Sequence, residues 1–267
     1  MKLCFSTLGC VEKSLDEIVA LAKRFSIEGL EIRGMSGKVA NAEIDEINEK
    51  NATKTKEYLK GSGLCPIVLG TSCAFHTKEK YEKAMKEGAV SIAIAKSLGI
   101  PYIRVFGNNI TENREECIAQ VSRGISELCT LARGEGVEVL LEVHGDYNTA
   151  EALGDVIGRL EGRDNFGLIW DIAHSHRVYG NGWLPFYESI KPYIRHVHIK
   201  DLCDSTGALT LVGKGDIPII PIAEKLIADG YDGYFSLEWE RQWHPELDDI
   251  ETALEHFVSH LSPLIKK

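Results

Sequence analysis

The sequence has no run of about 18 apolar residues, the length that a helix needs to cross a bilayer, so we expect no membrane partner. The apolar stretch at its start is shorter than the roughly 7–15 residues of a signal peptide and is interrupted by Ser6 and Thr7. Basic residues are outnumbered by acidic ones, 30 against 40, and the net charge is −10. Because phosphate backbones attract Lys and Arg, nucleic acid is disfavoured as a partner.

The sequence also lacks two motifs, a Cys-x-x-Cys pair and a dinucleotide-binding loop. The seven cysteines contain no Cys-x-x-Cys pair and their number is odd, which favours reduced, structural thiols in a cytoplasmic protein. The segments Gly107-Asn-Asn and Gly213-Lys-Gly215 do not match a Gly-x-Gly-x-x-Gly loop in front of a helix. A dinucleotide-binding domain is therefore not expected.

The sequence does contain a regular alternation of strand-like and helix-like segments. Eight apolar, strand-like segments cover residues 3–7, 29–33, 65–70, 102–106, 138–143, 167–171, 194–199 and 234–238. Helical spacing of apolar residues follows Ser14 and Glu17, which stand in a capping-box pattern, and recurs over 82–98, 115–133, from about 148 to 162, 217–227 and 247–264. Strict alternation indicates a parallel sheet, and one closed barrel typically needs about 250 residues. We therefore predict an α/β fold, a single (β/α)8 TIM barrel over residues 1–267.

Four of these strands end in residues that bind divalent metals. The segments read Glu142-Val-His144, Asp171-Ile-Ala-His174, His196-Val-His198-Ile-Lys200 and Leu-Glu238-Trp. A barrel brings the carboxyl ends of its strands to one mouth, where barrel enzymes act. Two Glu, one Asp and one His would form an oxygen- and imidazole-rich site there, suited to Mn, Mg, Co or Zn. Burying several carboxylates is otherwise costly unless a cation compensates.

Over nearly its full length the chain resembles the xylose isomerase-like barrels, which include ketose 3-epimerases, hydroxypyruvate isomerases, inosose dehydratases and apurinic endonucleases. The matching pieces are Leu-Glu31-Ile-Arg, Glu142-Val-His144, Asp171-Ile-Ala-His174, His198-Ile-Lys-Asp201, Gly213-Lys-Gly215-Asp216 and Leu-Glu238-Trp. The resemblance implies that one divalent ion is held by Glu142, Asp171, His198 and Glu238. It also implies that Glu142 and Glu238 act as an acid–base pair, and that His174 touches substrate oxygens.

Further residues are expected to line the pocket, namely Glu31, His76, Arg104, His144 and Lys200. The expected activity is that of a metal-dependent isomerase or epimerase of a small sugar, keto-polyol or sugar phosphate. Proton transfer would pass through an enediolate that the metal stabilises. Whether the chain forms a homo-oligomer stays open at this point.

Each of these residues also has a purely structural interpretation. Glu142 and Glu238 could be ion-paired structural carboxylates, Asp171 could cap the following helix, and His198 could be a packed core histidine. His196 is more simply explained by packing beneath the site. The aromatic residues that could form an apolar wall for a sugar, or simply pack, are Trp183, Phe186 and Trp239.

Three other activities remain as alternatives. A lyase that dehydrates a keto-polyol would use the same metal and carboxylates. An apurinic endonuclease would need an Asp-x-His after the seventh strand, where this chain reads Asp216-Ile-Pro218. A non-catalytic sugar-binding barrel would not need a paired acid and base.

Overall fold

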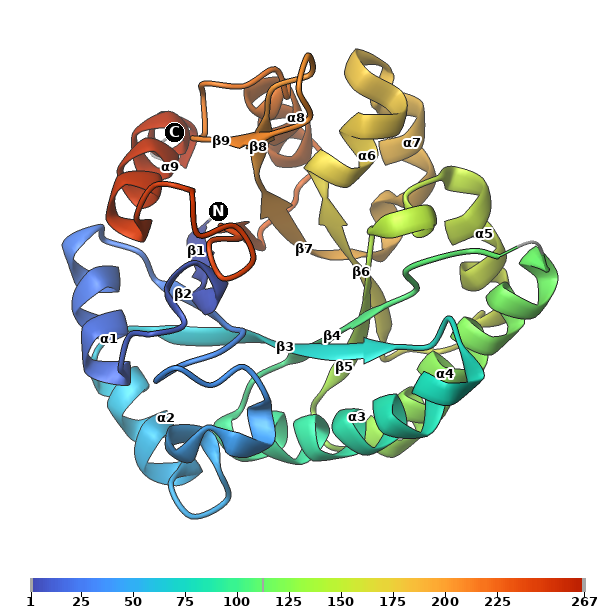
Figure 1. Ribbon diagram of the computed structural model, residues 1–267, viewed down its shortest axis with the longest axis horizontal. Helices are drawn as coiled ribbons and strands as arrows, with labels where there is room; N and C mark the ends of the chain where they lie inside the picture. Colours follow the sequence, from blue (N-terminus) through green and yellow to red (C-terminus); the bar gives the residue numbers. More distant parts are fainter. Residues whose placement is uncertain (1, 112, 266–267) are drawn as a thin grey trace.

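The computed structural model describes residues 2–111 and 113–265, with Ile265 described by its backbone alone. Eight parallel strands close into a barrel in the order β1-β10-β7-β6-β5-β4-β3-β2 (Figure 1). They are β1 (Lys2–Ser6), β2 (Gly29–Ile32), β3 (Cys65–Ala74), β4 (Tyr102–Phe106), β5 (Glu138–Glu142), β6 (Phe166–Asp171), β7 (Ile194–Ile199) and β10 (Tyr234–Leu237). The predicted (β/α)8 barrel is confirmed.

Helices surround the barrel and connect its strands (Figure 1). They are α1 (Leu15–Arg24), α2 (Ala52–Gly61), α3 (Lys78–Leu98), α4 (Arg114–Ala132), α5 (Ala150–Arg159), α6 (Ile172–Tyr179), α7 (Leu184–Ile190), α8 (Ile219–Ala228) and α9 (Ile250–Ile265). The predicted capping box begins α1, where Glu17 N donates to Ser14 Oγ and Ser14 N donates to Glu17 Oε2. None of the helices within the described residues is long and apolar enough to span a membrane.

Three connections differ from the simple alternation. Between β6 and β7 the chain forms two helices, α6 and α7. Between β2 and β3 the chain forms two short 3-10 turns before α2, and α2 begins at Ala52 without a side-chain cap on its first turn. Asn51, of a residue type that commonly caps helices, stands at the N-cap position but makes no capping hydrogen bond, and Asn48 Oδ1 instead accepts from the backbone N of Lys50 and Asn51. After β7 a small antiparallel hairpin, β8 (Asp201–Leu202) with β9 (Leu209–Thr210), precedes α8.

That hairpin and the glycine-rich segment after it are held by Asp201. Asp201 Oδ2 accepts hydrogen bonds from the backbone N of Gly213 and of Gly215, and Oδ1 accepts one from Ile217 N. A Cβ on Gly215 would lie 2.3 Å from Asp201 Oδ1. The Gly-Lys-Gly segment is thus a tight loop folded around a buried carboxylate.

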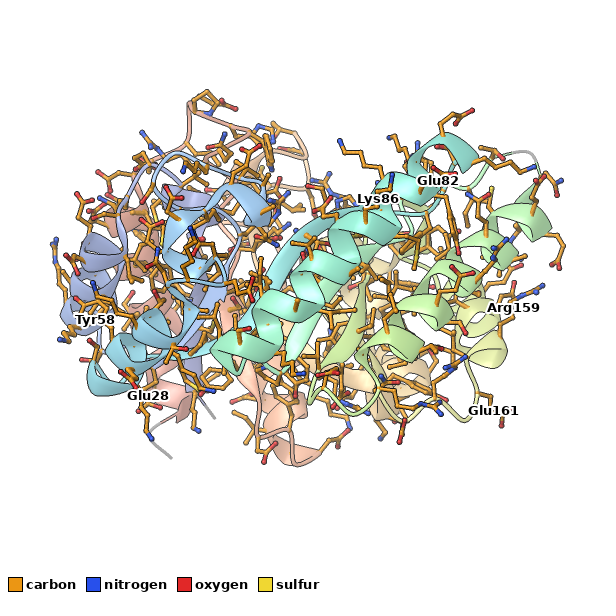
Figure 2. All side chains as sticks on the ribbon, turned by 90° about the horizontal axis from the view of Figure 1, so that it is seen from below. Glu28, Tyr58, Glu82, Lys86, Arg159 and Glu161 are labelled. Carbon is orange, nitrogen blue, oxygen red and sulfur yellow. The ribbon has the colours of Figure 1, made fainter. Side chains whose placement is uncertain are left out.

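The strands run in one direction, which fixes the face that carries their carboxyl ends. In Figure 2, Glu28 before β2 and Glu161 before β6 lie at the lower edge, whereas Glu82 in the first turns of α3 lies at the upper edge. The strands therefore rise through the molecule in this view. Their carboxyl ends, and the metal-binding residues expected there, lie at the upper face.

An apolar floor lies beneath that face. Leu140 and Ile169 stand two residues before Glu142 and Asp171, so each pair shares one side of its strand. Leu140 and Ile169 belong to a small buried apolar cluster, separate from the larger core that contains most buried residues of the helices. The polar residues therefore form a layer over a packed, water-poor interior, as barrel interiors require.

Candidate metal centre

Four side chains converge at the carboxyl ends of neighbouring strands. Glu142 ends β5, Asp171 ends β6, His198 lies in β7 and Glu238 follows β10. One ligand atom from each can be chosen so that all four lie within 4.8 Å of one another. All four residues are at most 2% exposed. The residues that the sequence predicted to converge are thus brought together.

The donor set fits a divalent cation. His198 Nδ1 lies 3.3 Å from Glu238 Oε2, 3.7 Å from Glu142 Oε1 and 4.0 Å from Asp171 Oδ2. His198 Nδ1, Glu142 Oε2 and Asp171 Oδ2 are buried and make no hydrogen bond of ordinary geometry to another described residue. Their contacts are instead with charged side chains: Glu142 Oε2 with Arg104, Asp171 Oδ2 with Lys200, and His198 Nδ1 with Glu238. Three carboxylate groups and one imidazole nitrogen match the ligands that Mn, Mg, Co and Zn accept.

Asp171 reconciles two roles that the sequence left as alternatives. Its Oδ1 accepts hydrogen bonds from the backbone N of Ala173 at 2.8 Å and of His174 at 3.1 Å, so it caps α6. Its Oδ2 faces the cluster. One oxygen therefore positions the helix that carries His174, while the other remains available as a ligand.

Two cations hold the cluster's carboxylates. Lys200 Nζ lies 2.8 Å from Asp171 Oδ2 and 2.6 Å from Glu238 Oε2, and it also contacts Glu240. Arg104 Nη1 lies 3.1 Å from Glu142 Oε2 and 2.9 Å from Glu238 Oε1. Arg104 therefore joins the two glutamates that the resemblance paired as acid and base.

These contacts keep the carboxylates ionised. Burial by itself favours the neutral form of Glu238, but Lys200 and His198 outweigh it and hold the pKa of Glu238 well below its usual range. Burial and the charge of Glu238 likewise oppose ionisation of Glu142, yet Arg104 leaves its pKa lowered. Both groups are therefore carboxylates at neutral pH, which is the state that a metal ligand or a base requires.

Glu31 lies beneath the cluster, away from the opening. It is fully buried, its Oε2 lies 2.9 Å from His198 Nε2 and 3.3 Å from His196 Nε2, and Ser236 Oγ donates to the same oxygen at 3.4 Å. Glu31 was expected to line the substrate pocket, but its position suits orienting His198 so that Nδ1 faces the carboxylates. Carboxylates commonly orient metal-binding histidines in this way.

Replacing Glu31 with Gln should weaken divalent-metal binding about 10- to 100-fold, because the orienting charge on His198 is lost. Competition with a chromophoric chelator measures that affinity. Glu28→Gln, at an exposed position just before β2, is the matched control and should leave it unchanged. Unaltered metal affinity in folded Glu31→Gln protein would rule out the orienting role.

The remaining predicted contacts divide into two groups. His174 and His144 lie side by side, with ring centroids 4.1 Å apart, and a ligand atom of Glu142 lies within 4.8 Å of one from each. Arg104 and Lys200 contact the cluster directly, as described above. His76 instead lies beside Lys80, 3.4 Å away, and it lines neither of the hollows at the mouth.

Two hollows open above the cluster and share His144, Lys200 and Glu240. The first has a volume of about 300 Å³ and is also lined by Arg33, Ser72, Arg104, Phe106, Asn108, Glu142, Glu238 and Trp243. The second, of about 430 Å³, extends toward His174, Arg177 and the β8–β9 hairpin. Together they offer room for a small polar substrate next to the carboxylates.

Several lining residues were not among the site residues predicted from the sequence. Glu240 stands two residues after Glu238 and Arg33 two after Glu31, so strand alternation was the available signal for both. Trp243 lies on the loop after β10, where no periodic pattern applies. Among the aromatic residues considered from sequence, Trp183 and Phe186 pack with Trp170, and Trp239 is buried and donates to Asp248 O.

Comparison with known proteins agrees with this geometry. The inosose isomerase of Bacillus velezensis is 27% identical over 94% of this chain and 93% of its own length. The inosose dehydratase of Serratia proteamaculans is 29% identical over 46% of this chain and 47% of its own.

Among solved structures, the IOLI protein with a binding zinc atom matches with a TM-score of 0.79 and 23% identity, covering 100% of this chain and 99% of that one. The D-psicose 3-epimerase of Clostridium cellulolyticum H10 matches with a TM-score of 0.77 and 15% identity, covering 98% and 97%. At these identities the structural likeness concerns the fold. The family model described as xylose isomerase-like TIM barrel matches residues 19–260 of this chain, and the chain therefore belongs to that family.

Proposed function

We propose that this protein is a divalent-metal-dependent isomerase or epimerase of a small keto-sugar, keto-polyol or sugar phosphate. The observation that carries the proposal is the pair Glu142 and Glu238. Both are buried carboxylates of one metal-ready cluster, both line the same hollow, and both contact Arg104. A pair of carboxylates at one cavity can remove a proton from a substrate and return one.

The metal would be held by Glu142, Asp171, His198 and Glu238. When bound, it would polarise a substrate carbonyl and so acidify the neighbouring C–H bond. Manganese, magnesium, cobalt and zinc all suit these ligands, and the structurally similar IOLI protein is described with a zinc atom.

The residues of the chain would divide the remaining work. One of Glu142 and Glu238 would accept the proton from the carbon next to the carbonyl. The other, ionised at rest, would first take up a proton from solvent through the open hollow and then deliver it. Arg104 would hold the two side chains in place and keep the accepting carboxylate ionised. The apolar floor formed by Leu140 and Ile169 would exclude water beneath them.

His174 would contact a substrate oxygen from the second hollow. His174→Ala should therefore lower turnover about 10- to 100-fold, the value of one or two lost hydrogen bonds, while metal affinity stays within a factor of about three. Steady-state kinetics and metal titration measure the two effects. His256→Ala on α9 is the control for losing an imidazole elsewhere. Loss of the metal in His174→Ala would mean that His174 is itself a ligand.

A second candidate is dehydration of a keto-polyol. The relatives include an inosose dehydratase, and the imidazoles of His144 and His174 lie beside Glu142, where one could protonate a departing hydroxyl. Removing the same C–H proton then leads to loss of water instead of reprotonation.

Product analysis tests the proposal and separates the two candidates. Purified protein would be incubated with inososes, ketoses and ketose phosphates in the presence of each candidate metal, and the products identified by NMR. An epimer or isomer of the same mass supports the proposed function. A product that has lost one molecule of water would replace it with the dehydratase.

A further inference from the structure

Arg33 is a buried cation in the first hollow that takes no part in the metal cluster. It follows β2, two residues after Glu31, and is 6% exposed. It lines the hollow together with Ser72, Asn108 and the catalytic pair proposed above. Its guanidinium is therefore available to a bound substrate while being largely shielded from bulk water.

The chain holds Arg33 in a fixed orientation. Its Nη1 donates to Val39 O at 3.1 Å and its Nη2 donates to Ser72 Oγ at 2.9 Å. Its backbone N donates to Thr7 Oγ1 at 2.8 Å. Its stem crosses Gly70, where a Cβ would lie 2.5 Å from Arg33 Cδ, so the absence of a side chain at Gly70 makes room for it.

Arg33 differs from the other buried cations of the hollow in its partners. Arg104 lies within 4.0 Å of Glu142 and Glu238, and Lys200 has several acidic partners. No carboxylate among residues 2–111 and 113–265 lies within 4.0 Å of the Arg33 guanidinium. The nearby Glu87 instead accepts a hydrogen bond from the backbone N of Ser72.

The charge on Arg33 therefore has no directly paired carboxylate, and Glu87, Glu238 and Glu31 favour it only from a greater distance. Burial and the charge of Arg104 lower the pKa of Arg33 to about 10, so the group is still a cation at neutral pH. A buried charge without a partner is unfavourable. Arginine presents a planar fork that matches a carboxylate or a phosphate group, often through two parallel hydrogen bonds.

We propose that Arg33 and Ser72 form an anion subsite, and that the substrate carries a carboxylate or a phosphate group which this subsite binds. Ser72 Oγ accepts from Arg33 and its own hydroxyl proton makes no hydrogen bond to another described residue, so it remains free to donate to the anion. This inference rests on the proposed function, because the subsite opens into the same hollow as Glu142 and Glu238.

The subsite narrows the substrate class. A neutral inosose or ketose would leave the Arg33 charge unpaired, whereas an acidic keto-polyol or a keto-sugar phosphate would pair with it. Binding an acidic group away from the reacting carbon also supplies energy that positions that carbon against the two carboxylates. We therefore expect acidic substrates to be preferred over their neutral counterparts.

Binding to the metal-free protein tests the subsite independently of turnover. Calorimetric titrations at low ionic strength would compare D-gluconate, inorganic phosphate and the neutral polyol D-glucitol, which has the carbon chain of gluconate without its charge. We expect at least one anion to bind about 10- to 100-fold more tightly than D-glucitol, the range for a hydrogen bond to a charged group. Preference for gluconate indicates a carboxylate substrate, and preference for phosphate a phosphorylated one.

Variants of Arg33 test whether this residue causes the preference for anions. Arg33→Gln should abolish the preference for the anion, whereas Arg24→Gln, which removes the same charge from an exposed position at the end of α1, should leave it intact. Arg33→Lys keeps the charge but loses the planar guanidinium, and it should retain a weaker preference for the anion. This variant keeps the test valid if Arg33→Gln does not fold. Equal binding of anions and D-glucitol by the wild-type protein, or an unchanged preference in folded Arg33→Gln protein, would overturn the subsite.

The two proposals can fail separately. Anion binding that depends on Arg33, together with no isomer or epimer from any acidic or neutral keto-polyol, would leave the subsite standing without the proposed reaction. Epimerisation of neutral ketoses with no effect of Arg33→Gln on anion binding would leave the reaction standing without the subsite.

Discussion

Replacing either Glu142 or Glu238 with Gln should lower turnover about 100- to 10,000-fold at saturating metal, the range for losing a general acid or base. Glutamine keeps the shape of the side chain but does not accept a proton at neutral pH, and it removes one negative charge from the metal cluster. Metal affinity should therefore fall as well, so the rates must be compared after each variant has been saturated with metal. Single-turnover kinetics with the substrate found by product analysis measure the effect.

The matched control is Glu138→Gln at the opposite end of β5. Glu138 is paired with Arg195 on the lower side of the barrel, away from the hollows. Its replacement should change turnover less than about twofold, because this half-buried position lies outside both hollows. Metal-saturated Glu142→Gln or Glu238→Gln with near wild-type turnover would remove the proton-transfer role from that residue.

Replacing His198 and Glu238 together with Ala should abolish stoichiometric metal binding. The wild-type chain should take up one divalent ion, since Glu142, Asp171, His198 and Glu238 form one compact donor group. The double variant keeps only two of those four ligands, and it leaves Glu31 with His196 as its remaining histidine partner. Elemental analysis after reconstitution and desalting measures the content, and the expected result is close to one ion per wild-type chain and close to none in the variant.

Because His198 and Glu238 are both buried, failure of the double variant to fold is the main alternative explanation for a loss of metal. Circular dichroism and the free energy of unfolding should therefore be recorded for both chains, with Glu255→Ala as an exposed control on α9. A folded double variant that retains a full ion would show that the metal lies elsewhere. A wild-type stoichiometry near three would point to a multi-metal centre instead.

The barrel could be predicted because eight mostly apolar, strand-like segments alternate with helix-like ones, several of which carry their own start and stop residues. The convergence of Glu142, Asp171, His198 and Glu238 followed from the same reasoning, since all four stand at strand ends. Helix α2 has few apolar residues, so no helical spacing marked it in the sequence, although Asn51 stands at its N-cap position. The hairpin β8–β9 depends on Asp201 contacts that span many residues, which a local pattern does not reveal.

The depth of a side chain in the barrel was harder to predict than its face. Glu31 and Arg33 share a face, but two residues along a strand are separated by about 6.6 Å. That distance is enough to place Glu31 beneath His198 and Arg33 in the wall of the hollow. The place of His76 apart from the two hollows was hard to predict for a related reason. β3 continues to Ala74, and His76 then turns toward α3 and Lys80.

Solvent deuterium incorporation is the most direct test of the central claim that Glu142 and Glu238 exchange a substrate proton. The metal-loaded protein would convert its substrate in deuterated water, and NMR would locate any label. Proton transfer predicts deuterium at the carbon next to the carbonyl, and loss of that exchange in both Gln variants. Conversion without label from solvent, with a specifically deuterated substrate showing direct transfer of hydrogen between carbons, would instead indicate a hydride shift and contradict the roles proposed for both glutamates.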